Sequence, residues 1–308
     1  MNLGKILVAT DFSEQAAVAL EQALRIARRA AAEVLLLHVS ELPLPHEDEL
    51  LRPELATLHK TAEEHLSTLR VQMDELWKET QQQGVNASKL IVDGWVDEAI
   101  ARVAAETAVD LVVVGTHGRT RLERLLLGSV AERVVRLAQT NVMVARRAPE
   151  AHGGDGFRRI LVPTDFSDPA PQILALAVQL AAADAQVELF HVLRLPYAVG
   201  VGFPEFAGAG LVEMERWRTG ARAEAQERGR KLAATAARPD VWMKVALAEG
   251  APAPEIHRKL EVAPWDLVVM GTHGRRGVRR GLLGSVAEAT VRHAPCSVIT
   301  VRAHAQAQ

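Results

Sequence analysis

The sequence predicts an α/β fold that consists of two tandem, doubly wound domains, each built on a five-stranded parallel sheet. The first observation behind this prediction is a duplication within the 308-residue chain. Residues 5–13 (KILVATDFS) return as residues 159–167 (RILVPTDFS), and residues 110–138 return as 266–294 with 20 of 29 positions identical. The second observation is that short apolar runs alternate with helical segments in each copy, which is typical of parallel strands covered by helices on both faces.

The elements of the first copy can be placed from its apolar pattern. Strands are expected at residues 5–9, 33–39, 89–92, 111–115 and 141–145. Helices are expected at residues 13–31, 53–83, 96–108 and 129–137, the first of them capped by the Ser13 hydroxyl. The second copy repeats this order, with strands near 159–163, 187–193, 241–247, 267–271 and 296–301. We place the two domains at residues 1–148 and 157–308, joined by a linker at 149–156.

Composition excludes several classes of protein. The single cysteine, Cys296, rules out a disulfide framework and fits a reducing compartment, so we expect a cytoplasmic protein in which this residue is part of the core. The longest apolar runs are far shorter than the ~18 residues that cross a bilayer, so no membrane association is expected. The net charge of −2 divides into −5 for residues 1–150 (17 basic, 22 acidic) and +3 for the rest (19 basic, 16 acidic). Neither half has the basic excess of a nucleic-acid binder.

The same set of glycines follows the fourth strand in both copies. Glycines at the end of a strand permit positive φ and let backbone N–H groups come close to a ligand. A helix N-terminus adds unpaired N–H groups and a partial positive charge. The pattern therefore predicts a phosphate-binding loop in each copy. Its residues are Gly115, Gly118, Gly128 and Ser129 in the first copy, and Gly271, Gly274, Gly284 and Ser285 in the second.

This spacing differs from two common nucleotide motifs. It is neither the G-x-G-x-x-G of dinucleotide-binding proteins nor the G-x-x-x-x-G-K-[ST] of P-loop enzymes. The structural alternative is that the glycines end strands and form turns, but the occurrence of the whole set twice favours a phosphate site. His117 and His273 lie inside the loops and are candidates for phosphate contacts or for surface positions. Neither has a second ligand at metal-binding spacing, so no metal site is predicted.

Two aspartates extend the predicted site. Asp11 and Asp165 directly follow the first strand of each copy, and ligands of open α/β sheets bind at the carboxyl ends of strands where the strand order reverses. We therefore expect Asp11 to lie across a crevice from Gly115. A carboxylate there suits a sugar hydroxyl and would repel phosphate. The alternative role for each aspartate is an Asx-turn or helix cap beside Ser13 or Ser167.

Both copies resemble the universal stress protein family, in its ATP-binding branch. The family motif G-x2-G-x9-G-[ST] is complete twice, and the strand-one VPTDFS occurs at residues 162–167, while Ala9 stands where the family usually has Pro. The resemblance implies a Rossmann-like, adenine nucleotide alpha hydrolase-like fold that binds ATP, with or without Mg²⁺. It also implies ribose or base contacts at Asp11 and Asp165, and adenine contacts at the backbone of Val39 and Val192. Ribose and phosphates would be held by Gly115, Gly118, Gly128, Ser129, Val130, Gly271, Gly274, Gly284, Ser285 and Val286.

The resemblance further implies that the two copies pair through their fifth strands, residues 141–145 and 297–301. The result would be an intramolecular pseudo-dimer, which leaves open whether two chains pair again. The first copy departs from the family ending H-A-P-C-P-V at residues 137–143, whereas the second keeps HAPCSV at 293–298. This departure bears on the pairing edge of the first copy.

Three functions are compatible with the residues. An ATP-binding regulatory protein of the stress response is favoured, and a slow ATP hydrolase of the same fold or an adaptor with empty nucleotide sites are the alternatives. No catalytic residues are identified, because neither a general base nor an arginine finger stands out in the sequence. His38 and His191, near the end of the second strand of each copy, are expected to be buried with a backbone partner. The sequence does not identify the protein partner.

Overall fold

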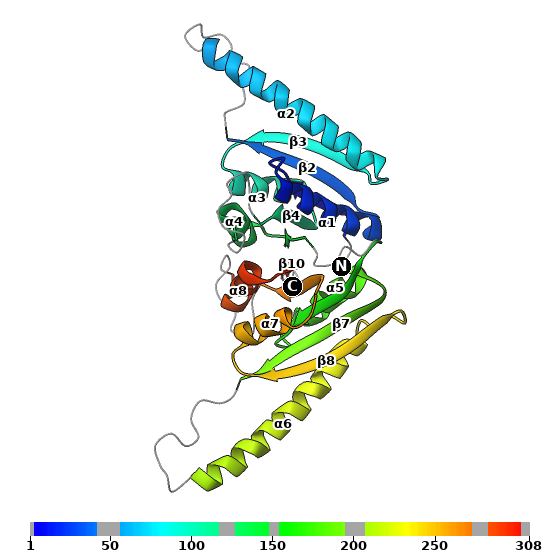
Figure 1. The fold of residues 1–308 in the computed structure, drawn as a ribbon, viewed down its shortest axis with the longest axis vertical. Helices are drawn as coiled ribbons and strands as arrows, with labels where there is room; N and C mark the ends of the chain where they lie inside the picture. The colour runs from blue at the N-terminus through cyan, green and yellow to red at the C-terminus, as the bar shows by residue number, and fades with distance from the viewer. Residues whose placement is uncertain are drawn as a thin grey trace.

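The computed structural model describes residues 3–41, 56–116, 127–147, 154–194, 207–272 and 283–302. These residues form one ten-stranded sheet in the order β3-β2-β1-β4-β5-β10-β9-β6-β7-β8, with helices on both faces (Figure 1). The two copies of the sequence are the two halves of this sheet. The predicted doubly wound α/β architecture is therefore confirmed.

The first half follows the predicted alternation of strands and helices. Its elements are β1 (Lys5–Ala9), α1 (Glu14–Ala30), β2 (Glu33–Ser40), α2 (Ala56–Gln82), β3 (Ala87–Asp93), α3 (Val96–Glu106), β4 (Leu111–Gly115), α4 (Ser129–Leu137) and β5 (Asn141–Ala145). The predicted cap at Ser13 is present, since its side chain accepts a hydrogen bond from the Ala16 N–H at 3.2 Å. Residues 53–55 of the predicted second helix lie outside the described residues.

The second half repeats this order with one large difference. Its elements are β6 (Phe157–Pro163), α5 (Ala170–Leu180), β7 (Ala181–Leu193), α6 (Ala207–Ala234), β8 (Val241–Glu249), α7 (Pro252–Glu261), β9 (Leu267–Gly271), α8 (Ser285–His293) and β10 (Ser297–Val301). The prediction that the second strand starts near residue 187 is wrong by six residues, because α5 ends early. At this end, the Arg238 guanidinium donates to the carbonyls of Val178 in α5 and of Ala181 and Ala182 in β7, at 2.8, 2.8 and 2.9 Å.

The halves join through their last strands, as predicted. Of the strand pairs in the described residues, only β5 and β10 run antiparallel, with Met143 opposite Ile299 at the centre. Every other pair is parallel. Within each half the strand order reverses between its first and fourth strands, β1 and β4 or β6 and β9, which lie side by side. This is the position at which open α/β sheets bind ligands.

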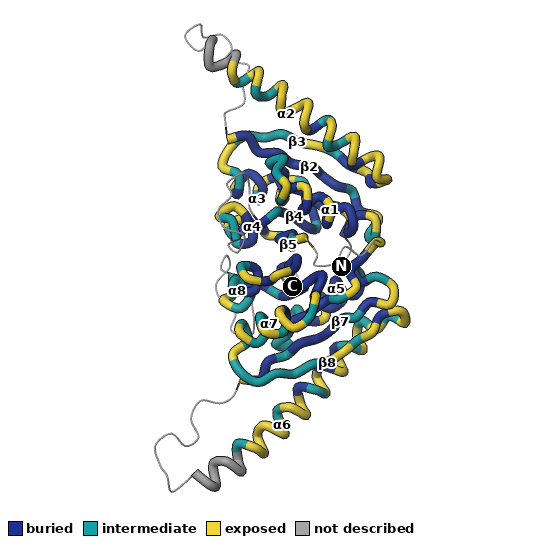
Figure 2. The backbone as a smooth tube through the Cα atoms, viewed as in Figure 1, coloured by how far each residue is buried: buried dark blue, intermediate teal, exposed yellow. Residues whose placement is uncertain are grey.

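Alternating side chains of the strands divide the apolar core into two layers. Ile6 and Val8 of β1 face the layer that α1, α2, α5 and α6 contribute to, whereas Leu7 faces the layer of α3, α4, α7 and α8. The long helices α2 and α6 lie at the two ends of the molecule, where much of their surface is exposed (Figure 2). Among the described residues, no helix combines the length and apolar character needed to cross a membrane.

Candidate functional site

The turn that follows the first strand has the same geometry in both halves. In the first half, the Thr10 hydroxyl accepts from the Phe12 N–H at 3.0 Å, and Asp11 Oδ1 accepts from the Ser13 N–H at 3.0 Å. In the second half, Thr164 and Asp165 accept the equivalent bonds, both also at 3.0 Å. The Asx-turn expected as an alternative role for the aspartates is thus present. It does not exclude a ligand contact, because each carboxylate oxygen can accept more than one hydrogen bond.

A phenylalanine and a histidine brace each turn. Phe12 and Phe166 have φ angles of 62° and 59°, in the left-handed region that large side chains rarely adopt. Their rings lie against His38 and His191, with ring centroids 4.9 and 4.6 Å apart. The predicted backbone partner of each histidine is confirmed. His38 Nδ1 lies 2.8 Å from the carbonyl oxygen of the threonine in its turn, and His191 Nδ1 lies 2.7 Å from its own.

Burial of these two histidines agrees only in part with the expectation. His38 is buried, whereas His191 is of intermediate exposure. The roles of Thr10 and Phe12 in this turn were not predicted from the sequence. The signal that could have found it is the repetition of TDFS in both copies, since a turn with a strained residue needs those neighbouring groups to hold it.

The backbone of Val39 faces β1, one of the two strands between which the strand order reverses. In a parallel sheet, the N–H and C=O of one residue face the same neighbouring strand. The Leu37 carbonyl accepts from Thr10 N and the Ser40 carbonyl accepts from Gly94 N, so alternate residues of β2 face β1 and β3. Val39 therefore faces the β1 side, beyond the last paired residue of β1, Ala9.

Val192 has the same orientation in the second half. The Phe190 carbonyl accepts from Thr164 N and the Leu193 carbonyl accepts from Gly250 N. Both valines are buried, at 8% and 7% exposure. This arrangement fits the base contact that the family resemblance implies for these residues.

Gly115 ends β4 where it approaches the start of α1. A Cβ atom at this position would lie 2.9 Å from the Gln15 carbonyl oxygen, which is closer than real Cβ atoms come. Glycine is therefore required here by close packing against backbone. This contact brings the end of β4 beside the start of α1, which follows the turn that carries Asp11. That Asp11 and Gly115 face each other across a ligand crevice stays a prediction.

The loop after the fourth strand is pinned at its base in both halves. The Gly128 N–H donates to the Thr116 carbonyl at 2.7 Å, and the Gly284 N–H donates to the Thr272 carbonyl at 2.8 Å. Residues 117–126 and 273–282 between these points lie outside the described residues. The predicted loop residues His117, Gly118, His273 and Gly274 are among them.

Each loop leads into a helix that begins without a side-chain cap. Gly128 and Gly284 are the N-cap residues of α4 and α8, and neither helix has a side-chain hydrogen bond at its cap. Ser129 and Ser285 are the first helical residues, and both are exposed. The N–H groups of the first turn have no side-chain cap and lie at the positive end of the helix dipole, an arrangement suited to an anion. Val130 and Val286 follow in this turn.

One reason given for the glycines is wrong. Both N-cap glycines have a φ of −64°, and neither Gly115 nor Gly271 is among the residues with positive φ. These four glycines do not provide left-handed backbone. At Gly115 the reason is close approach, and at the N-caps a glycine leaves the first helical N–H groups uncovered by a side chain.

Neither a reactive cysteine nor a metal site is found among the described residues. Burial raises the pKa of the Cys296 thiol to about 12, although the nearby Arg146 acts in the opposite direction. A thiol with this pKa is not a nucleophile at neutral pH, so the expected core role is supported. Within the described part of the chain, no cluster of three or more His, Cys, Asp or Glu side chains could hold a metal ion.

Together, these observations define a doubly wound α/β protein with a duplicated candidate site for an anion at its strand ends. The sequence pattern of the Universal stress protein family matches residues 2–146 and 156–302, nearly the whole chain. The chain belongs to this family, with two family domains in tandem.

Individual relatives agree with this assignment. Universal stress protein MJ0577 of Methanocaldococcus jannaschii is 35% identical over 153 residues, which cover 46% of this chain and 94% of that protein. Universal stress protein Mb2028c of Mycobacterium bovis is 30% identical over 209 residues, 65% of this chain and 64% of that protein. The crystal structure of a universal stress protein from Archaeoglobus fulgidus covers 98% of this chain and 99% of its own, with a TM-score of 0.62 at 21% identity. This last likeness supports the tandem fold.

Proposed function

We propose that the chain binds ATP at the strand ends of both halves and acts as a regulatory protein of the stress response in the cytoplasm. The observation that carries this proposal is the duplicated start of α4 and α8. Each helix begins uncapped, with an exposed serine, directly after a loop closed by a Gly-to-Thr hydrogen bond of 2.7 or 2.8 Å. Family membership supplies the expectation that the anion at this place is the phosphate group of an adenine nucleotide.

In this proposal, different residues contact the phosphates, the ribose and the base of the nucleotide. The N–H groups at Ser129, Val130, Ser285 and Val286 hold phosphate oxygens, and the loop residues His117, Gly118, His273 and Gly274 complete the phosphate contacts. Asp11 and Asp165 accept hydrogen bonds from the ribose or the base edge. The backbone of Val39 and Val192 meets adenine. Mg²⁺, where present, is held by the phosphates.

Nucleotide binding rather than turnover is the proposed activity. The described residues around each turn are a threonine, an aspartate held in an Asx-turn and a histidine bonded to a backbone carbonyl. We assign none of them as a general base, and slow hydrolysis is tested by phosphate release. Regulation would follow from different contacts with a protein partner in the loaded and empty states.

Calorimetric titration of the purified chain with ATP tests the proposal. The expected result is two sites for the wild type, one for Ser129→Glu, one for Ser285→Glu and none for the double variant. A glutamate at the first helical position repels phosphate, yet it favours the helix through the dipole, so folding should be retained. Ser129→Thr and Ser285→Thr are the matched controls, because they keep the hydroxyl and should keep binding.

Nucleotide identity is settled in the same experiment. AMP and cAMP are titrated beside ATP, since one similar structure is of a universal stress protein in complex with cAMP. Mass analysis of nucleotide released from freshly purified protein gives the natural ligand. A folded chain that releases no nucleotide and binds none of the three would overturn the proposal and favour the adaptor.

A further inference from the structure

Two arginines cross the junction between the halves in equivalent ways. Arg146 follows β5 of the first half, and its Nη2 donates to the Val291 carbonyl at 2.7 Å and the Arg292 carbonyl at 3.3 Å. These carbonyls belong to the last turn of α8, in the second half. Arg146 of the first half thus caps the C-terminal end of α8, a helix of the second half.

Arg302 makes the reciprocal contact. It follows β10 of the second half, and its Nη2 donates to the carbonyls of Val135 and Arg136 at 3.1 and 2.6 Å, in the last turn of α4. The backbone at each crossing is fixed by a side chain of the other half. Arg146 N donates to Ser297 Oγ at 3.0 Å, and Arg302 N donates to Asn141 Oδ1 at 3.1 Å.

Both arginines are held in surroundings that disfavour a charge. Burial lowers the pKa of Arg146 to about 10 and lowers the pKa of Arg302 from its usual range. Arg146 is nevertheless charged at neutral pH. The carbonyls that each guanidinium meets carry the negative end of a helix dipole, which compensates part of the lost hydration.

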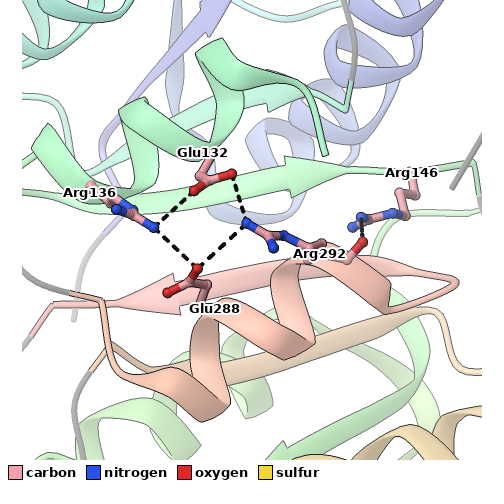
Figure 3. A network of polar contacts seen from close by, with 5 residues as sticks. All are labelled: Glu132, Arg136, Arg146, Glu288 and Arg292. Carbon is pink, nitrogen blue, oxygen red and sulfur yellow. Dashed lines mark hydrogen bonds and ion pairs between the residues drawn. The ribbon is translucent and has the colours of Figure 1, made fainter. Parts of the chain in front are cut away.

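The same two helices are joined along their sides by four alternating charges. Arg136 of α4 contacts Glu132 of its own helix at 2.9 Å and Glu288 of α8 at 3.2 Å. Arg292 of α8 contacts Glu132 at 3.0 Å and Glu288 at 3.5 Å. Figure 3 shows this ring between the helices, with Arg146 beside its end. Movement of α4 relative to α8 would break these contacts.

The helices tied in this way are the ones that carry the candidate phosphate sites. Each has nine residues, from Ser129 to Leu137 and from Ser285 to His293. Isolated helices of this length are marginal in water, so the direction of the N-terminal end depends on what holds the rest. A phosphate at the N-terminal end and a guanidinium at the C-terminal end would both stabilise the helix through its dipole.

We propose that Arg302 is a positioning residue for the nucleotide site of the first half, and that Arg146 is a positioning residue for the site of the second. Each half would then set the affinity of the other half's site, in addition to holding its own. This inference rests on the proposed function, because it assigns an effect to sites that bind nucleotide.

Single-site backgrounds test the crossed assignment. In Ser285→Glu protein, where only the first site binds, Arg302→Met is expected to weaken ATP binding about tenfold, while Arg146→Met changes it less than about twofold. In Ser129→Glu protein the two effects exchange. Methionine keeps the length of the arginine stem, and Arg302→Lys, which keeps the charge but not the planar fork, should recover part of the affinity.

Amide hydrogen exchange gives a readout that does not depend on nucleotide. Arg302→Met should speed exchange in α4 and leave α8 unchanged, and Arg146→Met should do the reverse. If both variants weaken both sites equally, or if exchange changes crosswise while ATP affinity stays the same, the arginines are structural caps only and the inference is wrong. If the wild type binds no nucleotide, the proposed function fails instead, and the exchange data show whether the crossed anchoring itself exists.

Discussion

The two halves fill one position of the core with opposite chemistry. Leu35 and Glu188 occupy the same register position in the second strand of each half. In the first half Leu35 belongs to the same buried apolar cluster as Val103 of α3, which is the counterpart of Lys259 in the duplication. In the second half Glu188, only 1% exposed, forms an ion pair with Lys259 of α7, with Nζ 2.5 Å from Oε1. A hydrophobic contact in one half is thus a buried ion pair in the other.

The strand ends of the two halves behave differently from their cores. The turns that hold Asp11 and Asp165 have the same hydrogen bonds at the same 3.0 Å. The loops after β4 and β9 close with bonds that differ by 0.1 Å, at 2.7 and 2.8 Å. The comparison teaches that the sheet faces need only to be filled, whereas the hydrogen bonds of the turn after the first strand and at the base of the loop after the fourth are kept in both halves. That difference is expected if the strand ends bind a ligand.

Replacing the ion pair of Glu188 and Lys259 by the apolar residues of the first half gives the largest predicted effect on stability. Lys259→Val places the first-half residue at this position and leaves Glu188 unchanged. Glu188 is then buried without its nearest cation, which should lower the free energy of unfolding by about 3 kcal/mol. The double variant Glu188→Leu with Lys259→Val imports the whole apolar pair and should restore stability to near wild type or above. Urea unfolding measures both.

The remaining cation near this carboxylate limits the effect. Lys244 Nζ lies 3.4 Å from Glu188 Oε2 but its side chain is 58% exposed, so it should compensate only in part. A double variant that is no more stable than Lys259→Val would contradict the prediction. It would mean that Lys259 stabilises the second half mainly through its contacts with the Trp265 and Phe190 rings, 5.8 and 5.7 Å away.

Close packing at the strand end gives the next largest effect. Gly115→Ala places a Cβ atom 2.9 Å from the Gln15 carbonyl oxygen, so the end of β4 and the start of α1 must separate. The expected cost is about 1–3 kcal/mol in the free energy of unfolding, as for other overpacked positions. Loss of ATP binding at the first site, but not at the second, should accompany it in calorimetric titrations.

A second glycine serves as the control for this variant. Gly220 lies in α6 with nothing within 4 Å of its added Cβ. Gly220→Ala should therefore raise stability by about 0.5–1 kcal/mol, because alanine is the better helix former. Equal and small effects of the two substitutions would show that the approach at Gly115 is easily relieved.

Sequence patterns were sufficient where the determining residues are neighbours in the chain. Buried strands need unbroken apolar runs, so β1, β4, β5 and β9 lie at the predicted residues. The duplicated loop and its Gly-Ser placed the candidate phosphate site before any contact was known. The family resemblance, rather than the residues alone, supplied the pairing through β5 and β10.

The failures have long-range causes. The end of α5 is contacted by Arg238, 60 residues beyond Val178, and no local sequence pattern predicts this contact. Arg146 and Arg302 reach helices more than 140 residues away, and each looks like an ordinary charged residue after a strand. The positive φ expected of the glycines that end the fourth strand is wrong for Gly115 and Gly271, because close approach and left-handed backbone both select glycine and look the same in a sequence.

The single cysteine gives a pH-dependent difference between the halves, since its counterpart in the first half is Thr140. The Cys296 pKa is about 12 in the folded chain and about 8.5 when unfolded. Between these values the unfolded thiol loses its proton while the folded one keeps it. The free energy of unfolding should therefore fall by about 1.4 kcal/mol per pH unit above pH ~9.

This fall has an upper limit in pH. Above about pH 10 the folded Arg146 loses its proton before the unfolded chain does, and that linkage raises stability as pH increases. Urea unfolding at pH 8, 9 and 10 should show the decline in the wild type and not in Cys296→Thr. Reaction of the native thiol with a disulfide reagent at pH 8 would contradict the assigned burial.

The ring between α4 and α8 gives the smallest effect and compares contacts within a half with contacts between halves. Its four side chains are 25–39% exposed, so each pair should contribute at most about 0.5 kcal/mol. Double-mutant cycles measure the coupling of Arg136 with Glu132, in its own helix, and with Glu288, in the other. We expect both couplings to shrink at 1 M salt, where the screening length is about 3 Å. A Glu288 coupling that survives 1 M salt, while the Glu132 coupling disappears, would show that the junction between the halves excludes ions and is more rigid than either helix alone.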